Sequence, residues 1–316
     1  MSRRAAAALV SIGLLGIAAP AAGADGVPVG GSSWEGVAAG PYRYVALPAG
    51  RGTVVARIWV AGGRPQFSRY FHRQLSVPAV ALDGAGGGLS HDGRTFVLTP
   101  PRTSYPQRAS TLYFLSPRTL QVRKTIHLKG DFSFDALSPD GATTYLIQLD
   151  SRNPAHYAVR ALDSATGRLA PKSVVDAREP GEEMRGYPYT RVTSADGRFA
   201  YTLYNGGDKP FVHALDTVAR SAACIDLPSL SQNSSSYKLR LDGRRLTVLA
   251  DNVPVSYVDT RTRAVSNAGA PPTRPHKEPG GGSSVPWGLI AGATAAALAA
   301  AAALVAVRRP RASAGR

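Results

Sequence analysis

Short runs in which apolar and polar residues alternate fill the middle of the chain, and a shared motif divides them into repeats. The motif is an apolar residue, two further residues, Asp-Gly, two more residues and a second apolar run, and its four copies carry Asp92, Asp140, Asp196 and Asp242. An Asp-Gly pair between alternating runs predicts a hairpin, because the tight turn needs positive φ at positions that Asp tolerates and Gly adopts freely. The four motifs therefore predict the start of four successive antiparallel units.

A second turn and a further strand follow each hairpin. The second turn ends an alternating run, as at 159–167 and 255–262, and the next strand is expected at positions such as 122–128 and 169–175. One more unit, without a clear Asp-Gly hairpin, is indicated upstream by alternating residues at 42–47, 54–61 and 67–75, with 34–39 as a candidate for its missing strand. Four short antiparallel strands in roughly 45 to 55 residues are the unit of a β-propeller, so we predict an all-β fold, a β-propeller of about five four-stranded blades.

Two arrangements of this propeller stay open. A closed ring of five blades is the first, and a ring that a partner chain completes is the second. Closure matters because an open sheet edge exposes unpaired backbone groups and favours aggregation. The number of blades and their closure are therefore left to the tertiary structure.

The N-terminus has the pattern of a cleaved signal peptide. Arg3 and Arg4 form a short positive region, residues 5–19 are apolar but too short to span a bilayer, and Ala22-Gly23-Ala24 fits the small-residue rule for cleavage. We predict a signal peptide over 1–24 that is cut after Ala24, with Ala21 as a second cleavage position. Residues 25–41 form a short N-terminal segment.

The C-terminus has the pattern of a tether and a membrane anchor. A stretch rich in Pro, Gly and Ser at 271–286 predicts a linker, because it has too little apolar surface to form a core. Residues 287–307 contain no charged side chain and are long enough to cross a bilayer, and Arg308, Arg309 and Arg311 follow directly in the tail 308–316. We expect a single-pass protein of the cell membrane, with residues 42–270 as an extracytoplasmic ectodomain and a cytoplasmic C-terminus.

The blade motifs resemble those of a known group of propellers. The sequence Ser138-Pro139-Asp140-Gly141, an apolar strand, and then Leu162-Asp163 followed by Thr166-Gly167 are similar to repeats of WD-repeat-like, lactonase-like and quinoprotein-like bacterial propellers, as in actinobacterial membrane-anchored surface proteins. The Trp-Asp pair of true WD repeats is absent. Because that group includes binders, lactonases and accessory subunits, the resemblance implies a fold and leaves the function open.

Composition excludes several kinds of chemistry. Basic residues outnumber acidic ones 37 to 21, but no run of adjacent Lys or Arg with interleaved aromatics lies in the middle of the chain, so we expect no nucleic-acid partner. The six histidines show no metal-ligand spacing, and the single cysteine, Cys224, lies in an apolar stretch without a His-bearing motif. The glycines at 84 and 86–88 precede a hairpin and are expected to form a turn between blades. We predict no metal, no cofactor and no catalytic residue.

Three loops contain the residue types that are enriched at binding sites. The loop 178–191 lengthens one repeat spacing and concentrates charges and tyrosines, and the loop 100–108 has a similar character, as does 204–210. The predicted ligand contacts are Glu183, Arg185, Tyr187, Tyr189, Arg102 and Tyr105.

We expect a surface module that binds a peptide, a glycan or another surface protein. The alternative is a lactonase-like, metal-dependent hydrolase or lyase. Such enzymes hold a metal with Glu, Asn and Asp side chains at the central channel, whereas the repeated aspartates here have a structural reason to lie in turns. A purely structural or sensor role is weakened by the short cytoplasmic tail.

Overall fold

The computed structural model describes residues 32–153, 156–181, 184–206, 209–231 and 236–269, and these belong to a compact unit that ends at Pro271. The predicted signal peptide, linker, apolar segment 287–307 and basic tail lie outside the described residues. Within the described part no helix is long and apolar enough to cross a membrane. Every regular element of this part is a β-strand, so the predicted all-β class is confirmed.

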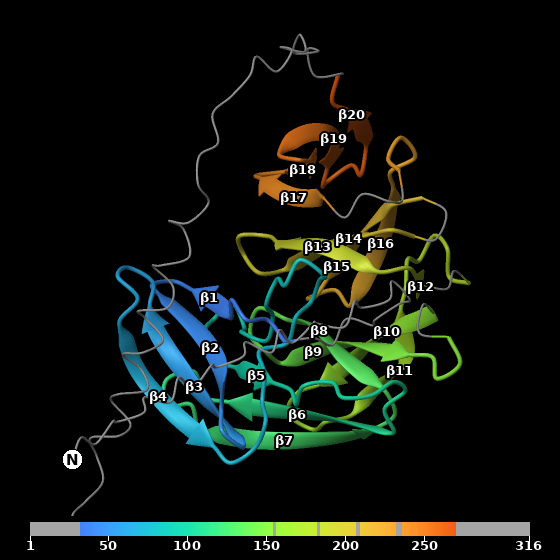
Figure 1. Ribbon diagram of the computed structural model, residues 1–316. Coiled ribbons are helices and arrows are strands. Elements are labelled where there is room, and N and C mark those ends of the chain that lie inside the picture. Colours follow the sequence, from blue (N-terminus) through green and yellow to red (C-terminus); the bar gives the residue numbers. More distant parts are fainter. Residues whose placement is uncertain (1–31, 154–155, 182–183, 207–208, 232–235, 270–316) are drawn as a thin grey trace, which may run out of the picture. The chain divides into compact units, whose positions relative to one another are not determined.

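Five antiparallel sheets follow one another along the chain, from blue to orange in Figure 1. The first contains β1 (Val37–Ala39), β2 (Tyr42–Ala49), β3 (Gly52–Trp59) and β4 (Pro65–Phe71). The second contains β5 (Phe96–Leu98), β6 (Ala109–Leu115) and β7 (Val122–Lys129). A single bridge from Leu89 to Phe96 takes the place of a first strand.

The third sheet contains β8 (Phe132–Leu137), β9 (Thr143–Leu149), β10 (His156–Asp163) and β11 (Leu169–Val174), and β12 (Met184–Arg185) also pairs with β10. The fourth contains β13 (Pro188–Thr193), β14 (Phe199–Tyr204), β15 (Phe211–Asp216) and β16 (Ser221–Asp226), and the fifth β17 (Tyr237–Asp242), β18 (Arg245–Ala250), β19 (Val253–Asp259) and β20 (Val265–Asn267). Apart from the pairing of β12 with β10, neighbouring strands in each sheet are neighbours in the chain, which is the meander of a propeller blade.

Three of the four Asp-Gly motifs form the same hydrogen-bonded turn. The hydroxyls of Ser90, Ser138 and Ser194 donate to the aspartate two residues later at 2.6, 2.6 and 2.5 Å. The same carboxylates accept the backbone N–H two residues further on, at 2.9 to 3.0 Å. The fourth copy has no serine, and its Asp242 is paired with Arg240 at 2.9 Å. The aspartates are therefore turn residues, as the hairpin prediction requires.

The antiparallel order gives each sheet two different ends. The turns from first to second strand and from third to fourth strand lie at one end, which we call the turn end. The connections from second to third strand and from one sheet to the next lie at the other, which we call the loop end. The predicted loops 100–108, 178–191 and 204–210 contribute to the loop end, but the prediction of a continuous loop over 178–191 is wrong in part, because β12 and the start of β13 lie within it.

The core consists of clusters that join consecutive sheets. Tyr44 of the first sheet packs with Phe96 of the second, and Phe114 of the second packs in a cluster with Leu146 of the third. Two clusters join the third and fourth sheets and one joins the fourth and fifth. Among the described residues none of the five clusters joins the first sheet to the fifth, so ring closure stays a prediction.

The connection from β4 to β5 does more than turn between blades. Ala79 pairs with Gly86, and the hairpin tip reaches the fourth sheet, where the N–H groups of Leu82 and Asp83 donate to the carbonyls of Pro188 and Tyr189 at 2.9 and 3.1 Å. The Asp83 carboxylate also pairs with Lys238 of the fifth sheet at 3.1 Å. The connection between the first and second sheets therefore also contacts the last two sheets.

Glycines permit this crossing because backbones approach closely there. A Cβ on Gly86 would lie 2.3 Å from the carbonyl oxygen of Gly36, and one on Gly87 would lie 2.7 Å from Val80 and 2.8 Å from Phe134. The glycine-rich stretch is thus a packing requirement as well as a turn.

We expect Gly86→Ala to lower the free energy of unfolding by roughly 1–3 kcal/mol, because the new methyl group meets backbone that cannot rotate away. Urea denaturation of the purified protein measures this. Gly181→Ala is the matched control, since no atom lies within 4 Å of its added Cβ, and it should change stability by less than about 0.5 kcal/mol. Equal stability of the two variants would contradict the close approach.

Candidate functional site

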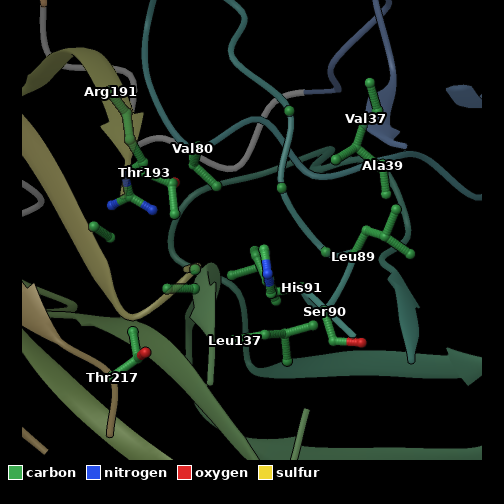
Figure 2. A pocket seen from close by; sticks show the side chains of 18 of the residues that line it. Val37, Ala39, Val80, Leu89, Ser90, His91, Leu137, Arg191, Thr193 and Thr217 are labelled. Carbon is green, nitrogen blue, oxygen red and sulfur yellow. The ribbon is translucent and has the colours of Figure 1, made fainter. Parts of the chain in front are cut away.

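A cavity of about 520 Å³ lies among the first strands of three sheets, β1, β8 and β13 (Figure 2). Val37 and Ala39 of β1 line one side and Arg191 and Thr193 of β13 line another, with His91 between them. Much of the remaining wall is backbone, because six glycines contribute to it: Gly36, Gly40, Gly86, Gly87, Gly88 and Gly197. The polar side chains of the lining are one charged pair, His91 and the hydroxyls of Ser90, Thr193, Ser194 and Thr217.

That pair consists of Arg191 of β13 and Asp135 of β8, whose side chains are only 6% and 2% exposed. The guanidinium donates to both the carboxylate and the carbonyl of Asp135, and its Nε donates to Thr202 Oγ1 at 2.7 Å. The two charges cancel inside the cavity wall and join the third sheet to the fourth. Sequence analysis did not select either residue for this role, because they are 56 positions apart.

His213 lies buried beside this pair. Its ring meets Tyr204 edge-on at 6.2 Å, and burial lowers the His213 pKa to about 4, with the charges of Asp135 and Arg191 acting in opposite directions. His213 is also the cross-strand neighbour of Cys224, a pairing that the sequence pattern did not suggest. An uncharged imidazole does not favour a thiolate, so this pair has no feature of an activated nucleophile.

A second cavity, of about 560 Å³, lies at the loop end between the second and third sheets. The predicted contact Arg102 lines it, but its guanidinium is held by Asp131 at 2.6 and 2.9 Å and by Ser133 at 2.9 Å. Its side chain is 11% exposed. Arg102 thus shapes the pocket, and its direct contact with a ligand stays a prediction.

Tyr105 anchors the same loop on the third sheet. Its hydroxyl donates to the carbonyl of Asp150, and its ring packs against the cluster that contains Ile147 and Tyr157. Burial raises the pKa of Tyr105, and the negative charges of Asp131 and Asp150 raise it further. The cluster against which Tyr105 packs also contains Met184, three positions before Tyr187, so the structure brings two separate predicted loops into one neighbourhood.

The other predicted contacts are distributed around this neighbourhood. Arg185 is exposed on β12, and Tyr187 is half-buried with its N–H bound to Asn205 Oδ1 at 2.7 Å. Tyr189 is half-buried, and its carbonyl accepts the hydrogen bond from Asp83. Glu183 lies outside the described residues. These predicted contacts are therefore one exposed cation, Arg185, and two half-buried tyrosines whose backbone groups also bind neighbouring segments.

The repeated aspartates do not form a metal site in the part of the chain that the structure describes. No group of three or more His, Cys, Asp or Glu side chains there has the proximity that a metal ion needs. The Asp140 and Asp196 carboxyls have pKa values below their usual range, because the hydroxyls of Ser138 and Ser194 and backbone N–H groups donate to them. These carboxylates act as turn acceptors.

Comparison with known proteins shows likeness in fold only. No protein-family model and no curated protein matches the sequence. Among solved structures, hydrazine synthase from Kuenenia stuttgartiensis is 16% identical with a TM-score of 0.44, covering 72% of this chain and 68% of that one. TolB from Acinetobacter baumannii is 15% identical with a TM-score of 0.39, covering 71% and 50% of the two chains.

The β-propeller domain of Cps50 (Swd1) from Myceliophteria thermophila is 12% identical with a TM-score of 0.41, covering 72% of this chain and 64% of that one. The chain thus spans about half of TolB and just under two thirds of the Cps50 domain. At these identities no activity follows from the likeness.

We expect Arg191→Met to lower the free energy of unfolding by about 3–5 kcal/mol, because it leaves the Asp135 carboxylate buried without a counter-charge. Urea denaturation measures this loss, and the double variant with Asp135→Asn should recover part of it. Arg240→Met breaks an exposed pair and should cost less than about 1 kcal/mol. A small effect at Arg191 would show that its charge is solvated.

We expect stability to fall by about 2 kcal/mol between pH 7 and pH 5, because only the unfolded His213 takes up a proton in that window. The folded pKa is about 4 and the unfolded value is 6.5. The contribution is therefore complete above pH 6.5 and lost as the pH falls toward 4. Denaturation curves at the two pH values measure it. His213→Gln should flatten this slope, whereas His127→Gln, at an exposed position, should keep it.

Proposed function

We propose that the described domain is a non-enzymatic binding module that takes an uncharged, hydrogen-bonding ligand, a segment of peptide or glycan, at its loop end. The observation that carries this proposal is the lining of the 560 Å³ pocket between the second and third sheets. Its guanidinium, Arg102, is neutralised by Asp131. Its other polar side chains are uncharged: Gln74, Thr99, Thr103, Gln107, Ser110, Thr111 and Ser133.

Apolar surface in the same pocket supports this choice of ligand. Phe132 and Phe134 offer rings, and Pro78, Pro100 and Pro101 offer further apolar contact. Ligand pockets typically combine apolar walls with a few fixed polar groups that set orientation. A ligand with alternating apolar and hydroxyl or amide groups matches that lining, whereas a charged one gains no free counter-charge.

Hydrogen bonds between the loop-end segments favour ligand binding with little rearrangement of the backbone. Tyr105 bonds to Asp150, the N–H of Gln107 donates to Asp131 at 2.8 Å, and Tyr187 bonds to Asn205. Each bond fixes a loop-end segment before a ligand arrives. A preorganised site loses less conformational entropy on binding.

Export and anchoring form part of the proposal. The pattern of residues 1–24 supports cleavage after Ala24, and the uncharged segment 287–307 supports a retained membrane anchor with the module outside the cell. N-terminal sequencing of the purified chain should begin at Asp25, and a chain that still begins at Met1 would contradict both.

We expect a photo-reactive residue at Thr103 to form a covalent adduct with the ligand in intact cells, because Thr103 is exposed and lines the pocket. The matched control places the same residue at Thr262, which is exposed at the turn end. Mass spectrometry identifies the adducts. Adducts specific to Thr103, and reduced in a Gln107→Ala background that removes a pocket amide, support the proposal. No adduct at Thr103, or the same adducts at Thr262, would overturn it.

A further inference from the structure

The net positive charge of the domain lies in its first two sheets. Residues 32–130 contain 13 Lys and Arg against three acidic residues, whereas residues 131–269 contain 16 of each. Two of the three acidic residues are already engaged, since Asp83 pairs with Lys238 and Asp92 accepts hydrogen bonds within its turn. The excess of positive charge in the first two sheets is therefore almost uncompensated locally.

Exposed apolar side chains gather in the same region. Ten large hydrophobic residues are exposed in the described part of the chain, and six of them belong to residues 34–70: Trp34, Leu47, Trp59, Val60, Phe67 and Tyr70. Single exposed hydrophobic residues are ordinary, but a concentration on one sheet marks an interaction surface.

The two features meet at the turn end of the first sheet. The hairpin between β3 and β4 is closed by the Trp59 N–H, which donates to the Arg64 carbonyl at 2.8 Å. It exposes Trp59 (36%), Val60 (51%) and Phe67 (38%), and Arg64 is exposed beside them. This hairpin tip thus presents aromatic and aliphatic groups together with a guanidinium.

Cations of the second sheet continue this surface. The Arg69 Nε of β4 donates to the carbonyl of Thr119 at 3.4 Å, which places the turn that contains Arg118 beside the first sheet. Arg123 bonds to the carbonyl of Arg94 at 3.4 Å, and the Arg94 side chain is 84% exposed. We call the group Trp59, Val60, Arg64, Phe67, Arg94, Arg118 and Arg123 the basic-aromatic surface.

We propose that the basic-aromatic surface docks on an anionic lipid bilayer. The arginines contact headgroup phosphates, to which their forked donors are matched, and Trp59, Val60 and Phe67 enter the interfacial layer. A soluble phosphate polymer is complementary to the arginines but offers nothing to cover Val60 and Phe67. The lipid interface is complementary to both parts of the surface.

The sequence places a bilayer within reach of the domain. Seventeen residues, 270–286, separate Gly269, the last described residue, from the apolar segment 287–307, and a Gly-rich chain of that length has an r.m.s. span of roughly 20–25 Å. Docking through the turn end leaves the loop-end pocket directed away from the lipid. The proposal concerns a different surface from the pocket and does not depend on it.

Trp59 is a reporter for this contact. In the full-length chain, Trp34→Phe and Trp287→Phe leave Trp59 as the only tryptophan. The protein is mixed with vesicles of phosphatidylglycerol, or of phosphatidylcholine, in which bromine atoms near the headgroup quench tryptophan fluorescence on contact. We expect strong quenching of Trp59 fluorescence by vesicles of brominated phosphatidylglycerol and little quenching by vesicles of brominated phosphatidylcholine. This difference should remain even if residues 287–307 insert into both kinds of vesicle.

Charge variants distinguish the effect of the basic-aromatic surface from the effect of the overall net charge. Replacing Arg64, Arg94 and Arg118 by Gln should reduce the quenching by about half or more, since each cation near an anionic surface adds attraction. Replacing Arg152, Arg168 and Arg261 by Gln removes the same charge from exposed positions in other sheets and should leave the quenching unchanged. Thermal melting confirms that both triple variants fold.

The remaining outcomes overturn the proposal. These are no quenching in phosphatidylglycerol, equal quenching in both lipids, or equal loss in both triple variants. A change of Trp59 emission with polyphosphate or with an acidic protein, but not with vesicles, would assign the surface to a different occupant. Loss of quenching in Val60→Ser, with all arginines kept, would separately support insertion of the hairpin tip.

Discussion

Close packing of the connection between β4 and β5 is the constraint on which the rest of the domain depends. This segment contacts all five sheets. The Leu75 N–H donates to Thr53 Oγ1 of the first sheet at 2.8 Å, the Gly88 carbonyl accepts from Val97 of the second, and Gly87 lies against Phe134 of the third sheet. Its tip binds β13 and Lys238 of the fifth sheet. In the described part of the chain the core clusters join only consecutive sheets. The glycine-rich connection between β4 and β5 adds contacts between sheets that are not consecutive.

The two ends of the sheets have different chemistry because their connections have different lengths. The turn end is made of short turns whose aspartates bind their own backbone, as Asp163 binds the N–H and hydroxyl of Thr166 at 2.6 and 2.8 Å. In the second, third and fourth sheets, and between sheets, the loop end has longer connections, which are held by side-chain bonds such as that of Tyr105. A pocket with uncharged polar groups forms there, whereas charge and exposed aromatic rings collect at the opposite end of the first two sheets. Ligand binding and surface attachment can therefore take place on separate parts of one domain.

Buried polar groups stabilise the junction of the third and fourth sheets in a way that makes it sensitive to change. Arg191 and Asp135 satisfy each other only when both sheets are in register. His213 stays neutral beside them because burial disfavours its charged form. The same low exposure that strengthens the pair makes the loss of either partner costly, and it ties the stability of this junction to pH.

The sequence by itself determined the local structure, because hairpins depend on residues that are close in the chain. Asp-Gly pairs and alternating runs identified the all-β class, the repeated four-strand unit and the turns at Asp92, Asp140, Asp196 and Asp242. They also located the three loops that the structure places at one end. Three contacts are visible only in the tertiary structure. Arg191 pairs with Asp135, the loop of Tyr105 lies near that of Tyr187, and Arg102 pairs with Asp131.

Those contacts link residues tens of positions apart, and no local pattern encodes them. The charge counts were present in the sequence, but the sheet boundaries were needed to show that the excess lies in residues 32–130. The glycines at 84 and 86–88 illustrate the same limit. Their turn-forming character is local, whereas the approach of Gly86 to Gly36 exists only once two distant segments pack together.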